Sequence, residues 1–129
     1  GASVGDYALF AGGNESMYSQ SIVNAYNTSL TKSTPTALSQ EKRDLAGASA
    51  GNYALFAGGR YYDYYFEDSL SVSSVDAYNT SLTRSTLTSL TEARYSLAGA
   101  SVGNYALFAG GGRDYYSNSA MVDAYYTGS

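Results

Sequence analysis

The side chains best suited to binding a ligand lie in three segments, each directly after a Gly-Gly doublet. The longest spans residues 60–68 and reads Arg-Tyr-Tyr-Asp-Tyr-Tyr-Phe-Glu-Asp, and its counterparts are residues 14–21 and 113–119. Tyr and Arg are frequent in binding sites because they bury a large area while losing few rotamers. We therefore predict a site for a protein or a glycan formed by Arg60, Tyr61, Tyr62, Tyr64, Tyr65, Phe66, Tyr18, Tyr115 and Tyr116.

The same segments also allow a purely structural interpretation. Alternating tyrosines can extend two flanking strands as one long hairpin and pack on each other across it. A contiguous patch of outward-pointing side chains at 61–66 would favour binding. Burial of those rings against the strand ends, or against a second subunit, would favour the structural interpretation.

Composition excludes several kinds of chemistry. The chain has no His and no Cys, which excludes imidazole bases, thiol nucleophiles, disulfides and Cys/His metal sites. Asp63, Glu67 and Asp68 offer the oxygen ligands that Ca²⁺ prefers, but their spacing fits no EF-hand loop. We therefore expect no metal site and no cofactor.

Two further carboxylates recur at equivalent positions. Asp76 and Asp123 match each other, with Asn24 at the same place in the first copy. A glycosidase needs two carboxylates at a defined separation. A residue that recurs with the repeat is better explained by turn capping, so we expect no catalytic residue and no enzymatic activity.

The charge balance limits the kinds of partner. Of the 129 residues 11 are acidic and 7 are basic, so the formal net charge is −4. Nucleic-acid binding depends on clustered Lys and Arg, and the balance therefore argues against it. No apolar run approaches the roughly 20 residues that span a bilayer, so we expect no membrane partner. The acidic surface, rich in Ser, Thr, Asn and Tyr, suits an extracellular or phage-borne protein.

Internal repeats dominate the sequence. Residues 5–13 recur as 51–59 and again as 103–111, at offsets of 46 and 52 residues. The block 23–31 returns at 75–83 and, in shorter form, from residue 122, and the block 38–45 returns at 90–97. Periods of about 40–50 residues indicate a repeat architecture, of which propeller blades are the all-β type.

One period is consistent with four short strands and no helix. Residues 97–101 are small and apolar, as in a crowded inner strand, and 105–109 are apolar on both faces, as in a strand between two sheets. The third strand is predicted at 75–78, and a weaker polar fourth strand within 85–90. Gly, Ser, Thr and β-branched residues occur in every candidate helical window, which disfavours helix.

This order of elements resembles the kelch repeat of β-propellers. An apolar strand, a Gly-Gly doublet, a Val-Asp-Ala-Tyr strand and a polar strand ending in Arg before Leu-Ala cover nearly the whole chain. Arg43 and Arg94 resemble the kelch arginine, and Tyr26 and Tyr78 the kelch tyrosine, while the usual Trp of the fourth strand is missing. The resemblance implies an all-β, kelch-like propeller arc of four-stranded antiparallel blades that serves mostly as a binding scaffold.

The arc is expected to be incomplete. We divide the single repeat domain, 1–129, into blade-like repeats 1–45 and 46–97 and a partial repeat 98–129, whose closing fourth strand is missing. Propellers have about 4–8 blades, so two apolar blade faces would be left open. Two copies closing a six-bladed ring, the remainder of a longer propeller, or stacking into a filament would each cover them. The runner-up function is a purely structural module, designed or natural, with no ligand.

Overall fold

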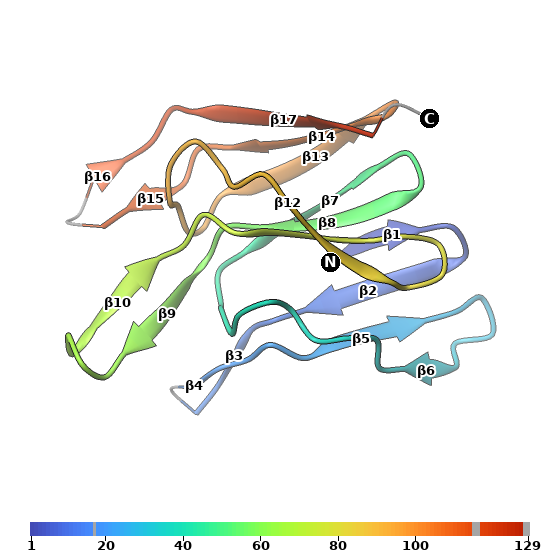
Figure 1. Ribbon diagram of the computed structural model, residues 1–129, viewed down its shortest axis with the longest axis horizontal. Coiled ribbons are helices and arrows are strands. Elements are labelled where there is room, and N and C mark those ends of the chain that lie inside the picture. Colours follow the sequence, from blue (N-terminus) through green and yellow to red (C-terminus); the bar gives the residue numbers. More distant parts are fainter. Residues whose placement is uncertain (17, 115–116, 128–129) are drawn as a thin grey trace.

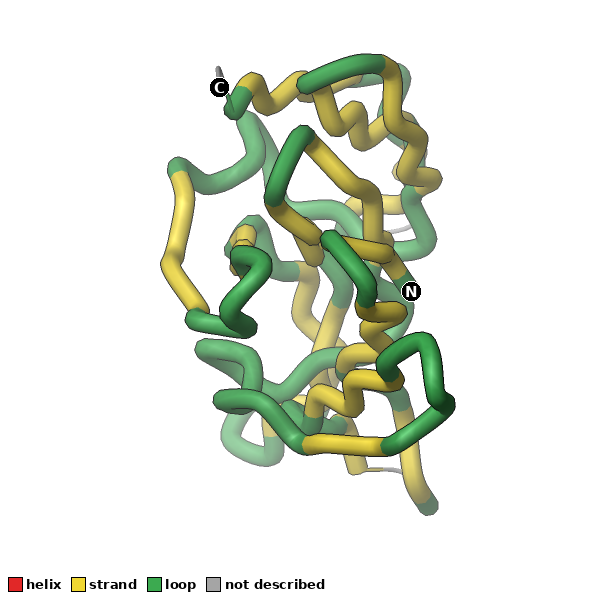
Figure 2. Tube along the Cα trace, turned by 90° about the vertical axis from the view of Figure 1, so that its right-hand side faces the viewer, coloured by secondary structure: helices red, strands yellow, loops and turns green. Residues whose placement is uncertain are grey.

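The computed structural model describes residues 1–16, 18–114 and 117–127, and the prediction of an all-β fold is confirmed. Figure 2 shows only strands and loops in the described part of the chain. Three larger antiparallel sheets follow one another in chain order, and Figure 1 shows them stacked from bottom to top. We call them blades 1, 2 and 3.

Each blade is built outward from one inner strand. Blade 1 contains β1 (Ala2–Val4), β2 (Tyr7–Ala11), β5 (Val23–Tyr26) and β6 (Lys32–Ser33), in that order. Blade 2 contains β7 (Ala46–Ala50), β8 (Tyr53–Ala57), β11 (Val75–Tyr78) and β12 (Arg84–Leu87). Blade 3 contains β13 (Ala98–Val102), β14 (Tyr105–Ala109) and β17 (Val122–Tyr126). In the described residues, blade 3 is therefore a three-stranded sheet.

Three small hairpins connect the second and third strands of the blades. They are β3 (Asn14–Glu15) with β4 (Tyr18–Ser19), β9 (Arg60–Asp63) with β10 (Asp68–Ser71), and β15 (Gly112–Arg113) with β16 (Ser117–Asn118). All three extend from the same end of the stack, at the left of Figure 1. The segments that carry the predicted binding residues therefore lie at one end of the molecule, which we call the hairpin end.

The inner strands β1, β7 and β13 pack side by side and require small residues. A Cβ added at Gly47 would lie 2.6 Å from the carbonyl oxygen of Gly1, a separation that real Cβ atoms do not show. The Ser49 amide donates to the hydroxyl of Ser101 at 2.8 Å, and the Ser49 hydroxyl donates to the carbonyl of Ser3 at 2.5 Å. The small, apolar inner strand predicted from the sequence is found, and these contacts explain its composition.

The core lies between the blades rather than within one of them. Because side chains of a strand alternate between its two faces, Phe56 points toward blade 1 and Leu55 points toward blade 3. Phe56 packs with Leu9 and Val23 of blade 1, and Leu55 packs with Phe108 of blade 3. A strand covered on both faces reads as a continuous apolar run, which is what β8 shows.

Candidate functional site

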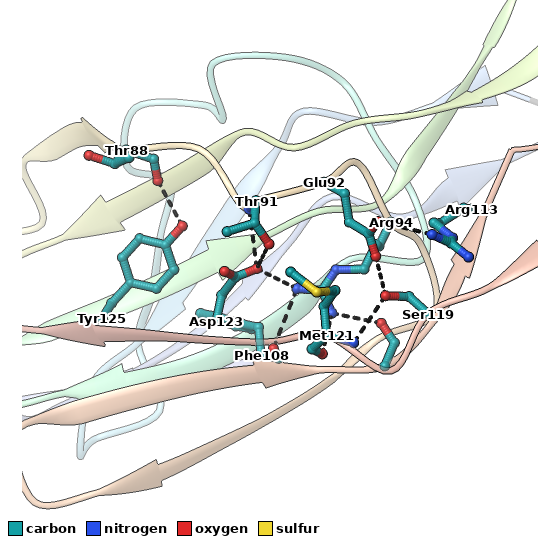
Figure 3. A network of polar contacts seen from close by, with 11 residues as sticks. Thr88, Thr91, Glu92, Arg94, Phe108, Arg113, Ser119, Met121, Asp123 and Tyr125 are labelled. Atoms are coloured by element: carbon teal, nitrogen blue, oxygen red, sulfur yellow. Dashed lines mark hydrogen bonds and ion pairs between the residues drawn. The ribbon is translucent and has the colours of Figure 1, made fainter.

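A fully buried arginine holds blades 2 and 3 together (Figure 3). Arg94 lies in the connection from β12 to β13 and donates through Nη1 to the carbonyls of Gly110 and Met121, each at 2.9 Å. Its Nη2 lies 2.6 Å from Oδ2 of Asp123 on β17. The same carboxylate oxygen accepts hydrogen bonds from the amide and hydroxyl of Thr91. We call this arrangement the 2–3 seam.

The seam between blades 1 and 2 repeats this design with one change. The amide and hydroxyl of Ser39 donate to Oδ2 of Asp76, both at 2.9 Å. The buried ammonium group at this seam belongs to Lys42, whose Nζ donates to the carbonyl and hydroxyl of Ser74 at 3.1 Å. A tyrosine of the third strand completes each seam: Tyr78 donates to the Thr36 carbonyl and Tyr125 to the Thr88 carbonyl.

The expected equivalence of Arg43 and Arg94 is therefore wrong. Lys42 occupies the position of Arg94, since their carbonyls accept the amide hydrogens of the equivalent glycines Gly13 and Gly59. Arg43 comes one residue later and points to the hairpin end, where its side chain donates to hydroxyl groups. Residue type alone favours Arg43 over the adjacent Lys42 as the counterpart of Arg94. The 52-residue offset of the repeat selects Lys42.

Burial at the seams shifts the pKa values of their titratable groups. Loss of solvent lowers the pKa of Lys42 to about 8, against the opposing attraction of Asp76. Burial, reinforced by the neighbouring carboxylate, raises the pKa of Tyr78 and of Tyr125 to about 12. Both phenols therefore stay protonated near neutral pH and act as hydrogen-bond donors between blades.

These contacts assign the recurring carboxylates a role in packing. Asp76 is buried and accepts hydrogen bonds from Ser39 and Thr86, while Asp123 accepts from Thr91 and pairs with Arg94. Each carboxylate belongs to a different seam, so the two do not converge on one substrate. The arrangement suits the joining of blades.

At the hairpin end, three tyrosines from two hairpins form one cluster. The ring of Tyr64 lies between those of Tyr62 and Tyr18, with centroid distances of 4.9 Å and 6.3 Å. Tyr64 is 63% exposed, and the neighbouring Tyr65 and Phe66 are 87% and 64% exposed. We call Tyr18, Tyr62 and Tyr64 the tyrosine cluster.

The structure places Arg60 apart from this cluster. Arg60 pairs with Asp44 at 2.7 Å, and its guanidinium carbon lies 4.2 Å from the centroid of the Tyr95 ring. It lines a separate cavity of about 210 Å³ between the hairpins of blades 2 and 3. Tyr61 is only half-buried in the β9–β10 ladder, opposite Leu70. Tyr115 and Tyr116 lie outside the described residues.

The hairpin carboxylates make local contacts. Oδ1 of Asp63 accepts the amide hydrogens of Tyr65 and Phe66, and Oδ1 of Asp68 accepts that of Ser69. Within residues 1–16, 18–114 and 117–127, no group of three Asp or Glu side chains has the geometry to hold a metal ion. The hairpin is in fact a paired ladder, as the structural interpretation requires, and its tip is exposed, as the binding interpretation requires.

The two outer blades each leave one face uncovered. On blade 1 this face carries Ala8, Phe10, Asn24 and Tyr26, and on blade 3 it carries Leu107, Ala109, Val122 and Ala124. Phe10 is 56% exposed and Val122 is 58% exposed, whereas their counterparts in blade 2, Phe56 and Val75, are buried. A shallow hollow of about 320 Å³ lies beside Phe10 and is also lined by Ile22 and Asn24. We call these surfaces the blade-1 face and the blade-3 face.

Comparison with known proteins identifies the architecture. The solved structure of YjhT, a kelch-like propeller fold, matches with a TM-score of 0.80 and 12% sequence identity, over 94% of this chain and 40% of that one. The chain thus spans about 40% of the length of the protein it matches. No protein-family model and no curated protein matches the sequence. The likeness shows the fold alone, and the chain is an incomplete β-propeller.

The described part of the chain contains no helix of the length and apolar character needed to cross a membrane.

Proposed function

We propose that the chain is a non-catalytic propeller module that associates head to tail, the blade-3 face of one copy packing on the blade-1 face of the next. Two copies would then form a closed ring. The order of strands, the Gly-Gly doublets and the seam residues support a relation to kelch repeats. Engagement of the recurring carboxylates in the seams supports the non-catalytic part of the proposal.

The observation that carries the proposal is that the chain contains a covered version of each open face. Phe56 and Tyr78 of blade 2 stand where Phe10 and Tyr26 stand in blade 1, and blade 1 covers them. Leu55, Ala57, Val75 and Ala77 correspond to Leu107, Ala109, Val122 and Ala124 of the blade-3 face, and blade 3 covers them. Each open face is therefore shaped for the other, and a second copy supplies both.

Ring size follows from blade number. A stack of three blades repeated twice gives six, which lies within the range of about 4–8 blades that propellers adopt, whereas three copies would exceed it. The contact is heterologous, so the same surface closes a ring if the rotation is right and builds a filament if it is not.

The experiment is a mass measurement by light scattering on the eluting protein. The expected mass is twice the 13.6 kDa of one chain. Phe10→Asp places a charge in the proposed contact and should give a monomer, because an unpaired charge is costly to bury. Phe66→Asp is the matched control: Phe66 is 64% exposed at the tip of the β9–β10 hairpin of blade 2, which carries neither open face, and this variant should remain a dimer.

Three results would contradict the proposal or part of it. If the measured mass is that of one chain both at high concentration and after dilution, self-association is refuted. Very large species that fall to monomers with Phe10→Asp would keep the contact and refute ring closure. A Phe10→Asp dimer with unchanged circular dichroism would show that another surface associates.

A second function is supported by the hairpin end. Tyr64, Tyr65 and Phe66 are consecutive, exposed residues at the hairpin tip, and the rings of Tyr62 and Tyr64 and of Tyr65 and Phe66 form two edge-to-face pairs. Exposure of these aromatic side chains favours ligand binding over a purely structural hairpin. We therefore propose that the module also recognises a ligand through these hairpins. Loss of binding with Tyr64→Ala, in a protein of unchanged mass and thermal stability, would support this role.

A further inference from the structure

The acidic residues of the chain are distributed unevenly. All of them except Asp6, Asp76 and Asp123 lie in the three hairpins or in the connections between blades that contact these hairpins. Three arginines lie at the same end: Arg60 pairs with Asp44, Arg113 pairs with Glu92, and Arg43 lies 3.9 Å from Asp44 and donates to the hydroxyls of Ser19 and Ser69. Eight carboxylates therefore stand against three arginines. The hairpin end therefore carries an excess of negative charge.

Three of these carboxylates lie on or near the two hairpins that carry the tyrosine cluster. Glu15 lies directly across the β3–β4 ladder from Tyr18. Glu41 is close enough to Tyr64 to act on its phenol electrostatically, and Glu67 follows Phe66 at the hairpin tip. All three are exposed, and none of them forms an ion pair with another described residue. They can therefore interact with a charge brought by a partner.

The rings of the tyrosine cluster are not coplanar. Tyr62 and Tyr64 meet edge to face at 74°, Tyr18 and Tyr64 are tilted by 37°, and the rings of Tyr18 and Tyr64 are 60% and 63% exposed, so part of their aromatic surface is open to a partner. Aromatic faces carry the negative part of the ring quadrupole and attract ammonium and guanidinium groups within about 6 Å. Both the aromatic faces and the surrounding carboxylates thus favour a positively charged ligand.

We propose that the tyrosine cluster binds the cationic side chains of a Lys- or Arg-bearing segment of a partner protein. The inference rests on the recognition role proposed above and names its ligand class. A neutral glycan would gain no attraction between opposite charges from Glu15, Glu41 and Glu67, and an anionic ligand would be repelled by them. The Tyr64 phenol stays neutral near physiological pH, because partial desolvation and then the neighbouring Tyr18 raise its pKa.

The test uses a fluorescently labelled synthetic peptide with four lysines separated by Gly and Ser, followed by fluorescence anisotropy at low and moderate salt. The same peptide with acetylated lysines should bind at least about tenfold more weakly, because the charge is lost. The trimethyl-lysine version should bind within about threefold of the parent, because it keeps the charge and loses hydrogen bonds.

Variants of the protein separate the aromatic contribution from general attraction. Tyr64→Ala should weaken binding about threefold to tenfold, and Tyr64→Phe, which keeps the aromatic face, should bind nearly as well as the parent. Glu41→Gln should weaken binding, whereas Asp6→Asn should not, since Asp6 lies in the β1–β2 turn away from the hairpins. The pair Glu41→Gln and Asp6→Asn changes the net charge equally.

The possible failures are distinguishable. Equal binding of the acetylated peptide, or binding of neutral oligosaccharides that Tyr64→Ala abolishes, would refute the cationic ligand and leave the recognition role standing. If Tyr64→Ala left binding of the lysine peptide unchanged, diffuse electrostatic attraction would account for that binding, and the cluster would be refuted as the site. No binding of any peptide or oligosaccharide would contradict the recognition role itself.

Discussion

Removal of the Arg94 side chain should be among the most damaging single changes in this fold. Arg94 is fully buried, Asp123 is 12% exposed, and their side chains meet at 2.6 Å. Arg94→Ala removes one hydrogen-bond donor from the carbonyls of Gly110 and Met121 and leaves the Asp123 carboxylate, which keeps only Thr91, without its cation. Removing one partner of a buried ion pair costs about 3–5 kcal/mol. With a urea m-value of about 2 kcal/mol per molar, the unfolding midpoint should fall by about 2 M.

Urea denaturation followed by circular dichroism measures this effect, and Arg113→Ala is the matched control. Arg113 also pairs with a carboxylate, Glu92 at 3.2 Å, but its side chain is 43% exposed. An exposed pair is worth at most about 1 kcal/mol, so the control should move the midpoint little. Arg94→Lys should recover part of the loss, because Lys42 fills the equivalent place at the other seam. A loss below about 1 kcal/mol for Arg94→Ala, or one no larger than that of the control, would refute the reasoning.

Two further predictions concern the seams and the faces. The pKa of Lys42 is about 8 in the folded chain and 10.5 when unperturbed. Between these pH values the unfolded chain therefore binds more protons than the folded chain. The free energy of unfolding consequently rises with pH, by at most about 3 kcal/mol. Lys42→Met should flatten this rise in urea titrations from about pH 8 to about pH 10, and an unchanged slope would show that Lys42 is not its source. Phe56→Ala should cost about 3–5 kcal/mol, whereas Phe10→Ala, at concentrations where the chain is monomeric, should cost less than about 1 kcal/mol. Equal losses in thermal or urea unfolding would mean that the repeat position does not determine burial.

The repeat pattern predicted the strands well because each strand is a local apolar run bounded by turn residues. The expected strands at 105–109 and 75–78 coincide with β14 and β11, and the polar strand expected within 85–90 begins at Arg84. The small residues of the inner strand were also a sufficient signal. Each of these features depends on residues close together in the sequence.

The contacts between blades were harder to predict. Ser39 and Asp76 are hydrogen-bonded although they lie 37 positions apart in the sequence, and neither residue type indicates that the other is its partner. The pairing of Tyr18 with Tyr64 depends on how two hairpins from different blades lean together. The offset of 52 residues is the signal in the sequence that identifies Lys42 as the counterpart of Arg94, whereas matching by residue type selects the neighbouring Arg43.

The equivalence of the two seams has a consequence for how such a chain can change in length. Excision of residues 46–97 would join residue 45 directly to residue 98. Ser39 and Thr36 would then face Asp123 and Tyr125, which are the same chemical types as the Asp76 and Tyr78 that they now contact. Lys42 would meet the carbonyl of Met121 in place of that of Ser74 and would lose only the serine hydroxyl. Loss or duplication of a whole blade by recombination between the similar coding stretches would thus leave a junction with most of its hydrogen bonds in place.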